Sequence, residues 1–287
     1  MQIKVLRDVF SQRPKGSSLM EYMNMLLYQF GYRDMIMDTG YNYLLAKGDI
    51  DIALVAHLDT VHEVSPYDIF YDKEQKVMWS PQGLGADDRA GATLILNILE
   101  QGLRPHIILT TGEEKGCIGA SQLVQDYPEP PFNIRFMIEL DRSGSNDAVF
   151  YDCMNHSFID YITTFGFEFD EGSFTDIVVL GEEWNVAAVN LSVGYYYEHS
   201  KSEYWDLAEA EVTLDRVIEI LNDTSNTNSY IFVPITKDNR IIKCGCGKTC
   251  RPGEYTVTSW VDERTNATFC YPVCSECAEY ADDVTNF

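Results

Sequence analysis

Five short motifs of acidic residues and histidines carry side chains that can bind metal ions or transfer protons. A hydrolase that works with two metal ions needs one carboxylate between the ions, nitrogen or oxygen ligands on each ion, and a free base that takes a proton from water. The five motifs together provide all of these groups. In chain order they are His57-Leu58-Asp59, Gly85-Ala86-Asp87-Asp88, Gly112-Glu113-Glu114, Glu139-Leu140-Asp141 and Glu198-His199.

The motifs that contain His57, Glu113 and Asp141 each come at the carboxyl end of an apolar run. Open α/β sheets place their active sites outside this end of the strands. We therefore expect these three motifs to meet at one edge of a sheet. His57 closes a predicted strand over residues 52–56, and Asp59, two residues later, can orient the imidazole of His57.

The remaining roles are divided among neighbouring carboxylates. Asp87 is the natural bridging group, because it lies in a glycine-flanked loop just before a predicted helix. Glu113 and Glu114 are adjacent, so their side chains diverge, and one can bind metal while the other stays free as a general base. Asp141 and His199 complete the set, with one ligand for each ion.

Predicted strands and helices alternate from the amino terminus to Asn222, and most of the strands are apolar throughout. This pattern indicates an α/β fold with a mostly parallel mixed sheet that helices cover on both faces. A hairpin is predicted over residues 35–46. Helices are predicted over 17–30, 88–101, 116–125, near Phe158 and over 203–222, and strands over 52–56, 107–111, 134–140 and 186–193.

The segments around the five motifs resemble the signature stretches of the clan MH metallopeptidases. This group contains di-zinc aminopeptidases, dipeptidases, carboxypeptidases and aminoacylases. The resemblance covers about residues 50 to 222. It is carried by the stretches Ala56-His-Leu-Asp-Thr-Val61, Gly83-Leu-Gly-Ala-Asp-Asp-Arg-Ala-Gly91, Thr111-Gly-Glu-Glu-Lys-Gly116 and Glu139-Leu-Asp141.

The resemblance assigns a role to each ligand at the matching positions. It implies that Asp87 bridges two zinc ions, that Glu114 and His199 complete one ion, and that His57 and Asp141 complete the other. Cobalt and manganese also suit such a site. Each ligand would then come from a different motif of the set.

Two further properties follow from the same resemblance. Glu113 would act as general base and then as general acid during hydrolysis of an amide bond. The peptide bond between Asp87 and Asp88 would be cis, which is rare when the second residue is not proline.

The spacing of the motifs leaves no room for the lid or dimerisation domain that many clan members insert. His57 and Asp87 are close in the sequence, and the interval from Asp141 to His199 is also too short to hold a further domain. This favours a compact aminopeptidase-like domain in which loops set specificity. Arg142 and Tyr196 are the candidate substrate-binding residues. The loops concerned are Arg142-Ser-Gly144, Phe174-Thr-Asp176 and Tyr195-Tyr-Tyr197.

The composition limits the expected partners. The formal net charge of −24 disfavours phosphate-rich partners, so we expect neither nucleic acid nor a membrane surface as a partner. No stretch approaches the ~18 apolar residues that span a bilayer. The amino terminus has no apolar segment followed by a cleavage site, so no signal peptide is expected. We therefore expect a cytoplasmic protein that acts on a peptide or on a small molecule with an amide bond.

A polar run over residues 223–229 marks a predicted domain boundary. We expect a di-zinc peptidase-like catalytic domain over residues 1–222, a linker over 223–240, and a cysteine-rich zinc-binding module over 241–287. Beyond the polar run, acidic and basic side chains nearly balance. The strong acidity therefore belongs to the larger domain.

The tail holds six of the eight cysteines. In a reducing compartment, clustered cysteines serve more often as metal ligands than as disulfides. A Cys-x-Cys-Gly-Lys element at Cys244 and Cys246 and a Cys-x-x-Cys element at Cys274 and Cys277 resemble a zinc ribbon. We therefore predict one structural zinc ion on these four thiolates.

Other arrangements of the tail stay open. Cys250 could replace Cys244, Cys270 could replace one of the last pair, or disulfides could staple the tail instead. Strands are predicted over residues 254–260 and 267–270. The module is also a candidate surface for a protein partner.

The sequence thus predicts a zinc-dependent hydrolase of peptide or amide bonds, and specifically an aminopeptidase or dipeptidase-like exopeptidase. One alternative is a deacylase or amidohydrolase that acts on a small N-acyl or amide substrate. Another is a catalytically silent, metal-containing binding protein. The cysteines and histidines outside the motifs are expected to be structural or exposed, namely Cys117, Cys153, His62, His106 and His156.

Overall fold

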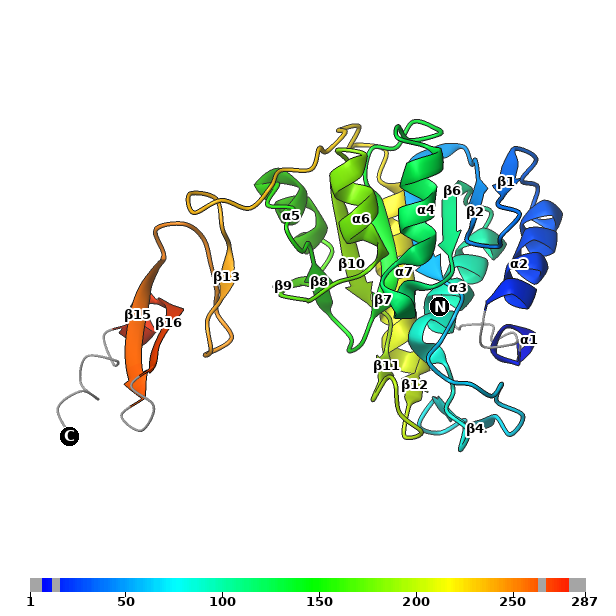
Figure 1. The fold of residues 1–287 in the computed structure, drawn as a ribbon, viewed down its shortest axis with the longest axis horizontal. Coiled ribbons are helices and arrows are strands. Elements are labelled where there is room, and N and C mark those ends of the chain that lie inside the picture. The colour runs from blue at the N-terminus through cyan, green and yellow to red at the C-terminus, as the bar shows by residue number, and fades with distance from the viewer. Residues whose placement is uncertain (1–6, 12–15, 263–266, 279–287) are drawn as a thin grey trace.

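The computed structural model describes residues 7–11, 16–262 and 267–278. An eight-stranded mixed sheet in the order β1-β2-β6-β3-β7-β10-β8-β9 forms its centre (Figure 1). Strands β6, β3, β7 and β10 run parallel to one another, and β1 and β2 form the predicted hairpin. The predicted α/β fold is confirmed. The strand bounds are β1 Met35–Met37, β2 Tyr43–Ala46, β3 Ile50–His57, β6 Pro105–Thr110, β7 Met137–Arg142, β8 Asp147–Val149, β9 Glu168–Asp170 and β10 Ala188–Ser192.

The central strands have an apolar side chain on each face, because successive residues of a strand point to opposite sides. In β3, Leu54 and Ala56 belong to the larger hydrophobic core, whereas Ala53 and Val55 belong to a second core on the other face. This burial on both faces explains why these strands are continuous apolar runs in the sequence.

Helices α2, α3, α5 and α7 contribute to the larger core, and α4 and α6 cover the opposite face. The sequence did not predict α6 or the short strands β8 and β9. Each of these elements is too short for its apolar residues to show a clear helical or strand repeat. The helix bounds are α1 Arg7–Phe10, α2 Ser17–Gln29, α3 Ala86–Glu100, α4 Ile118–Asp126, α5 His156–Thr163, α6 Asp176–Glu183 and α7 Leu207–Asn222.

A second, four-stranded sheet in the order β11-β12-β5-β4 lies beside the large sheet and was not predicted (Figure 1). It joins the chain between the first two motifs to the chain around the last motif. The buried side chain of Trp205 fixes it to the main body, since the indole Nε1 donates a hydrogen bond of 2.8 Å to the Val193 carbonyl. Its strands are β4 Phe70–Asp72, β5 Val77–Trp79, β11 Tyr195–Tyr196 and β12 Tyr204–Asp206.

The predicted start of the last helix at Glu203 is wrong. Residues 204–206 pair with β5 instead, and α7 begins at Leu207. The helix begins there because the Asp206 carboxylate accepts hydrogen bonds from the backbone N–H groups of Ala208 and Glu209, as an N-cap residue does. Apolar residues in β12 continue the helical pattern by coincidence, which hid this boundary.

The last part of the chain forms two hairpins that project from the main body (Figure 1). Before them, the chain first packs on the main body, where Tyr230 contacts Phe136 and Phe158. Hydrogen bonds from Met154 N to Val233 O and from Ala187 N to Tyr230 O hold this segment. The hairpin strands are β13 Ile242–Lys243, β14 Thr249–Cys250, β15 Tyr255–Asp262 and β16 Ala267–Cys274.

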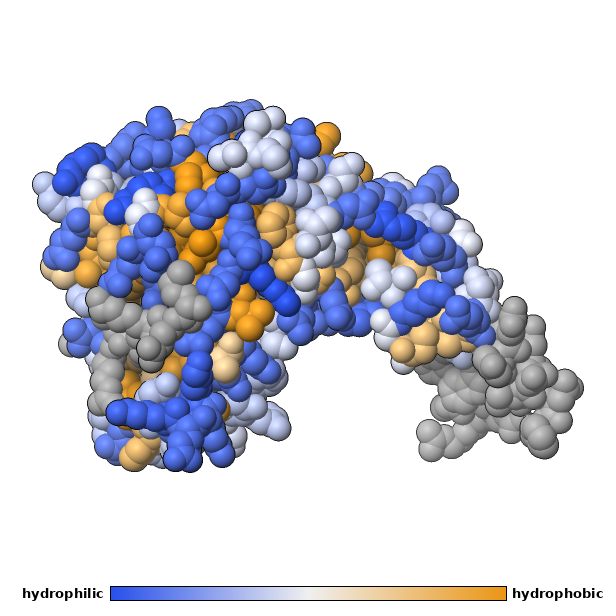
Figure 2. Space-filling view, turned by 180° about the vertical axis from the view of Figure 1, so that it is seen from behind, coloured by the Kyte–Doolittle hydropathy of each residue, from blue (hydrophilic) through white to orange (hydrophobic). Residues whose placement is uncertain are grey.

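The surface in Figure 2 is the face opposite to the view of Figure 1. Hydrophilic residues predominate on it, and hydrophobic groups gather in hollows of the main body. Within the described ranges, no helix combines the length and apolar character that crossing a bilayer would require.

Candidate metal centre and active site

The structure brings the predicted site residues together at one edge of the large sheet. His57 is the last residue of β3, and Asp141 lies near the end of β7. Glu113 and Glu114 begin a short 3-10 helix, Glu113–Lys115, that follows β6. Because these strands are parallel, their carboxyl ends meet at the same edge.

Asp87 lies between the two histidines. Its Oδ1 is 3.0 Å from His57 Nε2, and its Oδ2 is 3.0 Å from His199 Nε2. Each histidine also lies close to a second carboxylate. Asp141 Oδ1 is 3.6 Å from His57 Nε2, and Glu114 Oε2 is 3.1 Å from His199 Nε2. Two triads therefore form, and each can offer three ligand atoms within 4.8 Å of one another. Asp87 belongs to both triads.

The peptide bond between Asp87 and Asp88 is cis, as the resemblance implies. Asp88 supports the site and does not merely start a helix. Its fully buried carboxylate accepts hydrogen bonds from His57 N at 3.2 Å and from Gly91 N at 2.9 Å. It thereby ties the end of β3 to the loop that carries Asp87.

Asp59 lies beside the imidazole of His57, with 3.4 Å between Asp59 Oδ1 and His57 Nδ1. The same oxygen accepts a hydrogen bond of 2.7 Å from Gly112 N and one of 3.3 Å from Glu113 N. Asp59 therefore links the histidine of one motif to the backbone of another, which fixes the direction of Nε2 toward Asp87.

Glu113 stands apart from both triads. Its Oε2 lies 3.9 Å from His57 Nε2, so it faces the site without belonging to either set of three ligands. Burial raises the pKa of Glu113 to about 8, against an opposing effect of His57. A carboxyl group with a pKa near neutral suits a group that both accepts and returns a proton.

The donor set fits divalent cations. Five carboxylates, those of Asp59, Asp87, Glu113, Glu114 and Asp141, crowd around two imidazoles. Burial raises the pKa of Glu114 to about 7 and that of Asp141 to about 6, and Asp87 adds to both shifts. Glu114 Oε1 is buried without a hydrogen-bond partner among the described residues. Metal ions would neutralise this charge and occupy such an oxygen, and nitrogen and oxygen ligands in these numbers suit zinc.

A cavity opens on the Asp141 side of the triads. Among the residues that line it are Arg142, Phe174, Thr175 and Tyr195. These include members of all three loops predicted to set specificity. Tyr195, not the predicted Tyr196, faces the centre, since its hydroxyl donates to Asp141 Oδ1 at 3.1 Å. Successive residues of β11 point to opposite sides, so Tyr196 instead donates to Glu209.

The supporting role of Glu203 was not predicted. This buried carboxylate accepts hydrogen bonds from Gly85 N and from Asp87 N, the latter at 3.1 Å, and its Oε2 lies 3.0 Å from His62 Nε2. It therefore holds the loop of the bridging residue. A signal existed, because Glu203 follows the last motif by four residues, but the predicted helix concealed it.

Glu139 and Asp176 lie in segments that the sequence singled out, but no role was predicted for either of these buried carboxylates. Burial raises the pKa of Glu139 well above its usual range, and Asp141 and Asp176 raise it further. Thr175 Oγ1, next to Asp176, donates to Asp141 Oδ2 at 3.3 Å. Glu139 precedes Asp141 by two residues on the same strand. Because side chains two residues apart point to the same face of a strand, the sequence could have predicted that both carboxylates lie on one face.

The four preferred cysteines of the tail lie together. The sulfurs of Cys244, Cys246, Cys274 and Cys277 are all within 4.8 Å of one another. Four sulfurs in a tetrahedron around zinc lie about 3.8 Å apart, and Cys246 Sγ and Cys274 Sγ are separated by 3.8 Å. Cys250 is buried but does not belong to this group. The side chain of Cys270 lies outside the described residues.

The remaining histidines have structural partners, as predicted. His62 pairs with Glu203, and His106 accepts from Gly48 N at 3.0 Å through Nδ1. His156 Nε2 lies 2.6 Å from the Asn239 carbonyl.

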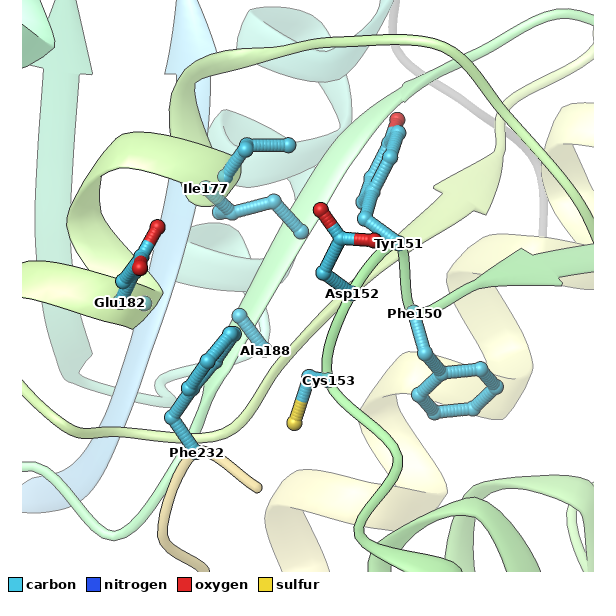
Figure 3. A pocket seen from close by; sticks show the side chains of 10 residues that line it. Phe150, Tyr151, Asp152, Cys153, Ile177, Glu182, Ala188 and Phe232 are labelled. Atoms are coloured by element: carbon cyan, nitrogen blue, oxygen red, sulfur yellow. The ribbon is translucent and has the colours of Figure 1, made fainter. Parts of the chain in front are cut away.

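The two cysteines of the main body, Cys117 and Cys153, are buried. Figure 3 shows Cys153 in a small crevice beside Phe232 and Ala188. Phe232 comes from the segment that follows the last helix of the main body. The crevice is therefore a junction between that segment and the sheet.

Residues 44–171 match peptidase family M28. This matched segment, somewhat less than half of the chain, is similar to that family. The match includes His57, Asp87, Glu114 and Asp141, whereas His199 lies beyond it. The resemblance to clan MH metallopeptidases is thereby confirmed, and the family supports the predicted function of a zinc-dependent peptidase of the aminopeptidase or dipeptidase type. No curated protein sequence matches the chain.

Solved structures share the fold of this chain at low sequence identity. Aminopeptidase PepT from Bacillus cereus is 14% identical, with a TM-score of 0.62 over 77% of this chain and 98% of that one. A tripeptidase from Staphylococcus aureus is 15% identical, with a TM-score of 0.61 over 75% and 95%. A Zn-dependent exopeptidase from Parabacteroides distasonis is 15% identical, with a TM-score of 0.54 over 76% and 94%.

We predict that the metal-free protein loses thermal stability as the pH rises from 5 to 9. Exposed glutamates titrate near pH 4.5, but burial raises the pKa of Glu113 to about 8 and of Glu114 to about 7. Their stabilising effect is complete below pH 4.5 and is lost as the pH rises through the folded values. A hydrogen bond to Asp87 raises the pKa of His199 to about 9, which acts in the same direction.

The measurement is the melting temperature across this range, after chelation and again with zinc added. Zinc should raise the melting temperature most at the alkaline end, where the carboxylates that it neutralises are ionised. A metal-free melting temperature that rises from pH 5 to 9, or a zinc effect that is larger at pH 5 than at pH 9, would contradict this explanation of the crowded carboxylates.

Proposed function

We propose that the protein is an exopeptidase that uses two zinc ions and acts on short peptides as an aminopeptidase or dipeptidase. The observation that supports this most strongly is the position of Asp87, whose two oxygens each lie 3.0 Å from a different histidine. A carboxylate placed in this way can serve two ions at once. The family match supports peptides as the substrate class.

In this proposal each triad would hold one ion. His57 and Asp141 would bind the first, Glu114 and His199 would bind the second, and Asp87 would be shared by both. When bound, a zinc pair lowers the pKa of water and stabilises negative charge on a carbonyl oxygen. Cobalt or manganese would supply the same kind of chemistry.

Glu113 carries out the proton transfers in this proposal. Its carboxylate accepts a proton from the attacking water and then gives it to the leaving nitrogen. The position of Glu113 supports this role, since it faces the site but lies outside both triads. Asp59 acts as a positioning residue, because it fixes the imidazole of His57 and the backbone N–H of Glu113.

We predict that Glu113→Gln removes turnover and leaves the metal ions bound. Glutamine keeps the size of the side chain but cannot accept the proton, and loss of a general base costs about 10²–10⁴-fold in rate. The measurement combines zinc content with the hydrolysis of aminoacyl-anilides and dipeptides. Glu183→Gln, an exposed glutamate of α6, is the matched control.

Normal hydrolysis by the Glu113→Gln variant would show that another group is the base. If the wild-type protein binds two zinc ions in the main body but cleaves no peptide or acyl-amide in a broad panel, the exopeptidase proposal is wrong. A deacylase would instead cleave N-acyl amino acids in preference to peptides with a free amino group.

We further propose that the tail is a separate zinc module over residues 241–287. The cluster of Cys244, Cys246, Cys274 and Cys277 supports this assignment. So does the arrangement of backbone N–H groups, since Cys274 N donates to Cys244 Sγ at 3.4 Å and Cys277 N donates to Cys274 Sγ at 3.4 Å. Such bonds stabilise thiolates. A core this small also requires a metal staple.

We predict that Cys277→Ser lowers the zinc content by one equivalent per chain, because three thiolates hold zinc more weakly than four. Cys250→Ala is the control from the same module and should keep all of the zinc, since Cys250 lies outside the cluster. The measurement is elemental analysis of the purified full-length variants. If the Cys250 variant loses zinc and the Cys277 variant keeps it, then Cys250, and not Cys277, is the zinc ligand.

A further inference from the structure

Among the described residues, Arg142 is the only arginine or lysine that lines the cavity beside the two triads. The cavity wall includes Asp87, Glu113, Asp141 and Arg142. Arg142 directly follows Asp141, and its side chain is 23% exposed. The wall of this cavity therefore carries one guanidinium group.

The guanidinium of Arg142 is anchored along one edge only. Its Nη2 donates to Asp170 Oδ2 at 3.0 Å and to the Glu171 carbonyl at 3.2 Å, and its Nε lies 3.7 Å from Asp147 Oδ2. Nη1 donates none of the hydrogen bonds found within the described residues. Gly172 lies beside Nη1 and has no side chain to cover it, since a Cβ there would be 3.4 Å away.

The other oxygen of Asp170 binds the cysteine module. Lys243 Nζ lies 3.2 Å from Asp170 Oδ1, and Lys243 immediately precedes Cys244 of the sulfur cluster. Asp170 thus accepts one cation on each oxygen, one from the active-site cavity and one from the module. Lys243 thereby fixes the direction of the carboxylate that holds Arg142.

We propose that Arg142 recognises a carboxylate of the substrate, and that the cysteine module holds Arg142 in place through Lys243 and Asp170. This inference rests on the proposed exopeptidase function. Within the described residues the two N–H groups of Nη1 have no acceptor, so Nη1 can donate charge-assisted hydrogen bonds to a carboxylate. Metal ions bound at the triads would offset the acidic wall and admit an anionic substrate.

Two substrate groups share this chemistry. One is the side chain of an acidic amino-terminal residue, and the other is the terminal carboxylate of a dipeptide. The test therefore uses two pairs of substrates with the zinc-loaded protein. The first pair compares glutamyl-anilide with glutaminyl-anilide, and the second compares a neutral dipeptide with its carboxyl-terminal amide. The pair with the larger ratio of kcat/KM identifies the source of the carboxylate.

For the pair that shows this preference, Arg142→Gln should lower the ratio of carboxylate to neutral substrate by about tenfold or more, which is the size expected for hydrogen bonds between charged groups. The change should fall on KM rather than on kcat. An equal loss for both substrates of the pair would indicate a structural role and would overturn the proposal. So would a wild-type enzyme that cleaves both members of each pair equally well.

Lys243→Gln tests the link to the module without touching the cavity wall. It should shift the same ratio in the same direction as Arg142→Gln, and it should have no further effect when combined with Arg142→Gln. Lys248→Gln is the matched control, because Lys248 lies in the same module but pairs with Glu276 at 2.9 Å. It should keep the wild-type ratio.

If Lys243→Gln leaves the ratio at the wild-type value, as Lys248→Gln does, the module does not position Arg142. A protein that cleaves none of the four substrates would contradict the proposed function itself, and this inference with it. A protein that cleaves neutral substrates without any preference would contradict only the inference.

Discussion

The structure depends on the crowding of carboxylates around Asp87. Five acidic side chains and two imidazoles share one small space, and burial raises the pKa values of Glu113 and Glu114 far above those of exposed glutamates. Such an arrangement is costly unless cations neutralise it. The same arrangement leaves Asp87 with one oxygen for each histidine. The placement of Asp87 between the two histidines and the excess of negative charge that favours bound cations therefore have a single cause.

The rest of the main body serves to hold this cluster at the edge of the sheet. Parallel strands deliver His57, Glu113 and Asp141 to one edge, and both of their faces are buried by helices. The small sheet brings His199 and Glu203 back to the loop of Asp87 from far along the chain. Glu203 and Asp88 then fix that loop through its backbone N–H groups and those of its neighbours.

Much of this could be predicted, because side chains that bind metal have few chemical alternatives and three of the five motifs directly follow apolar runs. The candidate ligand groups and the four clustered cysteines follow from local patterns, whereas the cis bond after Asp87 was implied only by the resemblance to clan MH metallopeptidases. The small sheet did not, since its strands are two or three residues long and their pairing is non-local. Glu203 and Tyr195 were missed or misplaced for that reason. The role of each depends on where the small sheet places its side chain.

The most direct test is anomalous X-ray diffraction from crystals of the zinc-loaded, full-length protein. We predict two zinc peaks in the main body, one bound by His57 and Asp141 and the other by Glu114 and His199, with an oxygen of Asp87 on each. One zinc peak at this site, or two peaks that Asp87 does not join, would contradict the central claim that a single shared carboxylate organises the site.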